Sequence, residues 1–232
     1  PAALALVREA LSVAEAAHDD PMAVEARLQL GALELARGDP VAAGASFRAA
    51  ETAAEAAGYA AGRARALAYL GALHVSLGDY PKALASFQKA AQTLEALGDR
   101  AGRAHVLGAI GDVFRRLIDY GRADDALALA RTAAEDVGDR EVQRAVATHE
   151  ANLLFSRGEL ERALKQHEAV RAAAAAAGAR TEEASAWANV GAVRAELGDL
   201  EAATEALEAA RAIVEELGDP ALARVLVNLG DV

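Results

Sequence analysis

The stretch Leu77–Phe87, LGDYPKALASF, decides the fold, because the chain returns to a version of it every 40 residues. Leu117–Leu127 reads LIDYGRADDAL, Ser156–His167 reads SRGELERALKQH, and Glu196–Leu207 reads ELGDLEAATEAL. Self-similarity at a fixed period is typical of arrays built from one supersecondary unit. The sequence therefore predicts a repeat protein.

Each repeat contains two predicted helices separated by glycine turns. Leu67, Leu70 and Leu73 recur at helical spacing, and similar runs fill the segments between turns. Glycine ends a helix in the left-handed conformation without steric cost, and an aspartate side chain can cap the next helix. The predicted caps are Asp39, Asp79, Asp99, Asp139, Asp199 and Asp219.

Two columns of small residues fall inside the predicted helices. A mid-helix glycine costs about 1 kcal/mol relative to alanine, so its recurrence indicates a compensating close approach between helices. The glycine column is Gly31, Gly71, Gly111 and Gly191. The facing alanine column is Ala43, Ala83, Ala123, Ala163 and Ala203.

The segment Ala66–Ala90 resembles a tetratricopeptide repeat. The family pattern falls on Leu70, Gly71, His74, Leu77, Gly78, Tyr80, Ala83, Phe87 and Ala90. The longer repeat of this chain is similar to those of Leu-Gly-Asn-repeat adaptors and of bacterial transcription and signalling regulators. Ile118 departs from the pattern at a turn glycine, Ala151 at a packing glycine, and His167 and Val170 at the following aromatic and alanine.

The resemblance implies an all-α fold, a right-handed superhelical solenoid of antiparallel helix pairs. We expect one array over residues 1–232. It comprises a lone second helix at 1–20, full repeats at 21–60, 61–100, 101–140, 141–180 and 181–220, and a truncated first helix at 221–232. Because both ends of this array lack a polar cap, we expect a fragment of a larger protein.

Composition excludes several classes of partner. The net charge of -11 opposes direct binding to a nucleic-acid backbone. No apolar run predicts a membrane span or a signal peptide, so a cytoplasmic location is expected. Arginine far outnumbers lysine and alanine is abundant, which indicates a bacterial source with a GC-rich genome.

Catalytic constellations are missing from the sequence. Cysteine is absent, and no histidine pair has metal-ligand spacing, so no metal and no cofactor is expected. The paired acids lie on polar helix faces, where solvation explains them better than acid–base catalysis. His167 and Trp187 occupy inward positions, for which packing is the preferred interpretation. We expect that the protein is not an enzyme.

The resemblance also implies a concave surface lined by the first helix of each repeat. At its lining positions we single out one set of candidate partner-binding residues: Arg65, His105, Asp112, Arg115, Arg116, Thr148, Asn152 and Phe155. The arginines form either a site for an anion or an acidic peptide, or a soluble surface in which they pair with Asp112 or Asp119. Asn152 occupies the position where Leu-Gly-Asn-type arrays hold a peptide backbone.

The predicted function is recognition: a non-catalytic scaffold that binds a protein or peptide segment, belonging to a bacterial signalling or regulatory protein. Two alternatives stay open. In one, the array senses a small ligand and controls an attached DNA-binding or nucleotide-cyclase domain. In the other, it self-associates through the uncapped ends of the solenoid.

Overall fold

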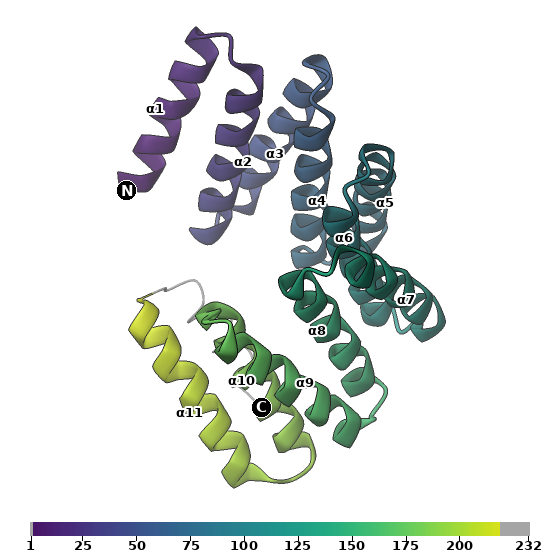
Figure 1. The fold of residues 1–232 in the computed structure, drawn as a ribbon. Helices are drawn as coiled ribbons and strands as arrows, with labels where there is room; N and C mark the ends of the chain where they lie inside the picture. The colour runs from purple at the N-terminus through teal and green to yellow at the C-terminus, as the bar shows by residue number, and fades with distance from the viewer. Residues whose placement is uncertain (1, 219–232) are drawn as a thin grey trace. The chain divides into compact units, whose positions relative to one another are not determined.

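The structure, a computed structural model, describes residues 2–218, and every regular element in this range is an α-helix (Figure 1). The helices are α1 (Ala2–Ala16), α2 (Asp20–Ala36), α3 (Pro40–Ala56), α4 (Ala60–Ser76), α5 (Tyr80–Leu97), α6 (Arg100–Arg116), α7 (Tyr120–Val137), α8 (Arg140–Ser156), α9 (Leu160–Ala176), α10 (Arg180–Glu196) and α11 (Leu200–Leu217). The predicted truncated helix at 221–232 lies outside the described residues.

The turns have the predicted chemistry. Asp99, for example, accepts a hydrogen bond at Oδ1 from the Gly102 N–H at 2.8 Å, and Gly98 ends α5 with φ of 70°. The predicted caps are confirmed at Asp39, Asp79, Asp99, Asp139 and Asp199, whereas Asp219 lies beyond the described range. Ile118 takes the left-handed conformation of the glycine that it replaces, with φ of 60°.

The chain divides into two compact units, the first ending at Leu117 and the second beginning at Ile118. In the first, α2 packs on α3 and α4 on α5 as antiparallel hairpins, and α3 joins the two hairpins by packing on α4. Its core is an apolar cluster that includes Val24, Leu28, Phe47 and Leu70. In the second, α8 packs on α9 and α10 on α11 in the same manner.

The glycine column permits close helix contact, as predicted. A β-carbon on Gly31 would lie 2.5 Å from the Phe47 ring, and one on Gly71 would lie 2.6 Å from the Phe87 ring. In the second unit, a β-carbon on Gly191 would lie 2.9 Å from Leu207. Gly111 and the whole alanine column (Ala43, Ala83, Ala123, Ala163 and Ala203) are buried.

The fourth repeat lacks both the mid-helix glycine and the aromatic residue that packs against it in other repeats. Ala151 stands for the glycine and His167 for the aromatic ring, and both are buried, His167 with 1% exposure. Its Nδ1 has no hydrogen-bond partner among the described residues. Burial lowers the pKa of His167 to about 4, so the ring is neutral at pH 7 and acts as a packing residue.

Trp187 on α10 packs against a small cluster of Ala184, Ile213 and Val214, with the Arg171 guanidinium 4.4 Å from its ring centroid. This agrees with the packing interpretation. The all-α class and the antiparallel helix pairs are confirmed. The joining of both units into a single array stays a prediction. No described helix is both long and apolar enough to cross a membrane.

Candidate functional site

Arg65 is tied to the preceding repeat. Its guanidinium on α4 forms two hydrogen bonds with Glu25 on α2, and the Nη1–Oε1 distance is 2.6 Å. The Tyr59 hydroxyl donates to the same Oε1 at 3.1 Å. Burial and the bond to Glu25 raise the pKa of Tyr59. The predicted groove residue Arg65 thus has a structural role in joining two hairpins.

Three other predicted residues form one cluster on α6. Asp112 accepts from Arg115 Nε at 2.9 Å and from Arg116 Nε at 2.7 Å. Burial acts to raise the pKa of the Asp112 carboxyl, but the charges and hydrogen bonds of the two arginines outweigh it and hold the pKa below its usual range. Of the two acids considered as their partners, Asp112 is therefore the one found, since Asp119 pairs with Arg122.

A large part of the Arg116 guanidinium remains accessible to solvent. Its side chain is 42% exposed, against 20% for Arg115. His105 lies about three turns before Arg116 on α6 and is also exposed. Because one carboxylate serves two guanidinium groups, the cluster has a net positive charge at neutral pH.

In the second unit, Thr148, Asn152 and Phe155 follow one another on the same side of α8 and are all partly exposed. The Thr148 hydroxyl donates to the Arg144 carbonyl at 3.0 Å. No hydrogen-bond partner within residues 2–218 engages the Asn152 carboxamide. Each unit thus contributes its own set of candidate residues.

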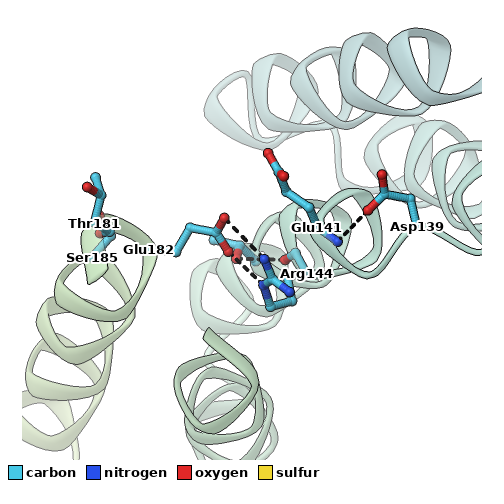
Figure 2. Close-up of polar contacts among 7 residues, drawn as sticks. Asp139, Glu141, Arg144, Thr181, Glu182 and Ser185 are labelled. Atoms are coloured by element: carbon cyan, nitrogen blue, oxygen red, sulfur yellow. Dashed lines mark hydrogen bonds and ion pairs between the residues drawn. The ribbon is translucent and has the colours of Figure 1, made fainter. Parts of the chain in front are cut away.

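The sequence did not single out Arg144, which is central to the second unit. Figure 2 shows its guanidinium reaching from α8 to Glu182 on α10, and the Nε–Oε2 distance is 2.7 Å. The Arg144 side chain is only 12% exposed, and the bond to Glu182 raises its pKa. Aligning the repeats with one another could have identified Arg144, because the equivalent position holds alanine in the second, third and fifth repeats.

Two concave regions lie on the second unit. The first, of about 290 Å³, lies among α7, α8 and α9. Its three arginines are paired: Arg157 with Asp124, Arg131 with Glu150 at 3.3 Å, and Arg162 with Glu159. The second, of about 740 Å³, is here called the α8–α9 groove. It is lined by Arg140, Gln143, Arg144, Ala147, Gln166, Ala169, Val170, Ala173, Ala176 and Ala177.

Within residues 2–218, no group of three histidine, cysteine, aspartate or glutamate side chains converges as metal ligands. The polar side chains present are donors and acceptors on exposed helix faces. Chemically, they can hold carboxylates and peptide groups.

The comparisons agree with this fold. The family model of the tetratricopeptide repeat matches residues 62–136. These residues belong to the tetratricopeptide repeat family, and the other described helix pairs have the same type of fold. No curated protein sequence matches the chain.

Several solved structures have the fold. BtubC (BKLC) from P. vanneervenii is 20% identical with a TM-score of 0.69, and the match covers 93% of this chain and 91% of that one. The Rap conjugation gene regulator of plasmid pLS20, solved in complex with the Phr* peptide, is 15% identical with a TM-score of 0.74. A Rap protein complexed with Competence and Sporulation Factor is 14% identical with a TM-score of 0.75. Each Rap match covers 89% of this chain and 57% of the Rap chain.

Proposed function

We propose that this protein is a non-catalytic scaffold that binds peptide or protein segments, with one candidate surface on α8 in the second unit and another on α6 in the first. The observation that carries the proposal is Asn152. Its carboxamide is partly exposed and unengaged, although α8 packs against helices on both sides. A carboxamide offers both a donor and an acceptor, which match the C=O and N–H of a peptide backbone.

The neighbours of Asn152 fit the same ligand. The Thr148 oxygen can still accept a hydrogen bond after the hydroxyl has donated to Arg144. Phe155 supplies an apolar contact one turn beyond Asn152. Backbone pairing combined with an apolar anchor is a common way for a protein to hold an extended peptide.

The α6 cluster, in the first unit, is a separate candidate surface with a preference for acidic partners. Arg116 exposes a guanidinium whose charge is only partly offset by Asp112. Arginine pairs with carboxylates in a planar fork, so an aspartate or glutamate of a bound segment can approach it. The Rap structures solved with peptides support this class of ligand for the fold. Because their sequence identity to this chain is low, the similarity concerns the fold alone.

We place this scaffold in the cytoplasm, within a bacterial signalling or regulatory protein. The arginine-rich composition and the shared fold with the Rap regulators support this setting. Control of an attached effector domain and self-association stay as alternative predictions.

A selection experiment tests the proposal. The intact protein is panned against a phage-displayed library of random dodecapeptides, and selected peptides are titrated by fluorescence anisotropy. Asn152→Ala should weaken binding about tenfold, because one unpaired peptide group costs about 1.4 kcal/mol or more. Asn189→Ala on α10 makes the same chemical change elsewhere and should leave affinity unchanged. Equal affinities for both variants, or a failure to select any peptide, would refute the proposal.

A further inference from the structure

The fourth repeat has exchanged a small and a large residue on α8. Where it has Arg144, other repeats have the fully buried residues Ala64, Ala104 and Ala184, or Val24 in the first. One turn further it has Ala147, where other repeats have Leu67, Leu107 and Trp187, or Arg27 in the first. At position 147, α8 therefore lacks the large apolar side chain that most repeats have there.

This exchange accounts for the α8–α9 groove. Ala147 and Arg144 both line it, and the Arg144 guanidinium extends to Glu182 on α10 (Figure 2). The opposite wall is α9, whose Ala169, Ala173 and Ala176 are exposed. At 1.5 Å per residue, the wall from Ala169 to Ala177 is about 12 Å long, which matches about four residues of an extended chain.

The groove also contains a cation without a matching acid. Arg180, at the first position of α10, pairs with Glu183 at 2.7 Å and with Glu216. Arg140 holds the same position on α8, but the corresponding residues are Gln143 and Ala176.

Gln143 and Ala176 both line the groove beside Arg140. Arg140 is exposed and has no carboxylate partner within residues 2–218. It also lies at the N-terminal end of a helix, where the macrodipole disfavours a cation. A carboxylate supplied from outside the chain would relieve both conditions.

We propose that the α8–α9 groove is a second docking site, for a partner segment that places a large apolar side chain beside an acidic one. The apolar side chain fills the space above Ala147, and the carboxylate pairs with Arg140. The Nε2 group of Gln143 donates to Ala134 O, and that of Gln166 donates to Ala147 O and Glu150 Oε2. Their Oε1 atoms can accept hydrogen bonds from the backbone N–H groups of the segment.

This site is separate from the one proposed above. Thr148, Asn152 and Phe155 do not line the groove, and their side chains project from a different side of α8 than Arg140 and Ala147. The two sites therefore respond to different substitutions.

Blocking the groove tests this inference. The intact protein and Ala173→Leu are each panned against the random dodecapeptide library, and peptides that bind only the former are titrated by fluorescence anisotropy. Ala173 is exposed on α9, so a leucine there obstructs the groove without entering the core. Ala172→Leu places the same side chain on an exposed α9 position outside the groove and serves as the matched control.

We expect peptides that combine aspartate or glutamate with a large apolar residue. Their affinity should fall at least about tenfold in Ala173→Leu, in Ala147→Leu and in Arg140→Gln, and stay constant in Ala172→Leu and in Asn152→Ala. Peptides sensitive to Asn152→Ala alone would support the first site and overturn this one. A selection without acidic peptides, or a groove that takes up octanoate but no peptide, would also overturn it.

Discussion

The ring of Phe87 on α5 lies so close to Gly71 on α4 that a β-carbon at Gly71 would be 2.6 Å from ring atoms Cδ1 and Cε1. The same relationship joins Gly31 to Phe47 forty residues earlier. Glycine is therefore the residue that lets the two helices of a hairpin pack through an aromatic ring. This explains why a residue that weakens isolated helices recurs inside them.

Gly71→Ala should destabilise the protein by about 2 kcal/mol, because the ring or the helix must shift to admit the methyl group. Urea denaturation measures the change. Gly121→Ala is the matched control: its β-carbon would meet only Asp119 Oδ1, at 3.9 Å, so a gain of up to about 1 kcal/mol is expected. A Gly71→Ala variant as stable as the wild type would contradict the packing account.

His167 should make stability fall in mild acid. Its folded-state pKa of about 4 lies below the ordinary value of 6.5, so the folded state binds fewer protons than the unfolded state between these values. Above pH 6.5 the neutral ring makes its full contribution to the free energy of unfolding. As the pH falls towards 4, this free energy decreases by about 3 kcal/mol in total.

Denaturation at a series of pH values measures this loss. Replacing this pair with the residues common in the other repeats, His167→Phe with Ala151→Gly, should remove the part of the pH dependence that comes from His167. The smaller part that comes from His74, whose pKa burial also lowers, should remain. His167→Phe alone should be less stable than the double variant, because Ala151 retains the methyl group that glycine lacks. The account of the buried ring is wrong if the double variant keeps the full acid sensitivity.

Ile118→Gly should stabilise the protein by about 1 kcal/mol. Ile118 has φ of 60° and is 74% exposed, so its β-branched side chain strains the backbone and gains little by burial. A rise in the thermal midpoint checks this expectation. Leu117→Gly, at the neighbouring residue with φ of -82°, should instead lower the midpoint. A fall with Ile118→Gly would show that this turn is not strained.

Replacing Arg115 and Arg116 by alanine should weaken binding of an acidic peptide by more than about 1 kcal/mol while helicity is retained. The change also leaves Asp112 without its two partners, so the pKa of its carboxyl should rise. Asp112→Asn keeps both arginines and provides the comparison: acidic peptides should bind this variant at least as tightly as wild type. An unchanged affinity in the double variant would mean that the arginines serve only the surface.

The sequence was sufficient for the helices and the packing columns, because these depend on local chemistry that repeats. Gly78 and Gly98 end helices, Asp79 and Asp99 begin them, and Gly71 faces an aromatic residue at a fixed spacing. Each of these features is visible in the letters alone. Because each feature recurs in several repeats, a role assigned to a residue in one repeat is supported by the same residue type in the others.

The ion pairs of the arginines were less predictable, because each long arginine side chain can reach several carboxylates. The sequence did not show that Arg65 bonds to Glu25 in the previous repeat, or that Arg144 reaches Glu182 in the next. The exchange at positions 144 and 147 was visible in the repeat columns. Its consequence, an open groove beside Arg140, required the arrangement of α8 and α9 in space.

The most direct measurement of peptide recognition is a backbone amide NMR titration of the intact protein with a peptide selected for its sensitivity to Asn152→Ala. The account predicts the largest shift changes at Thr148, Asn152 and Phe155 on α8. Shift changes confined to α1 or α11, with α8 unaffected, would contradict it.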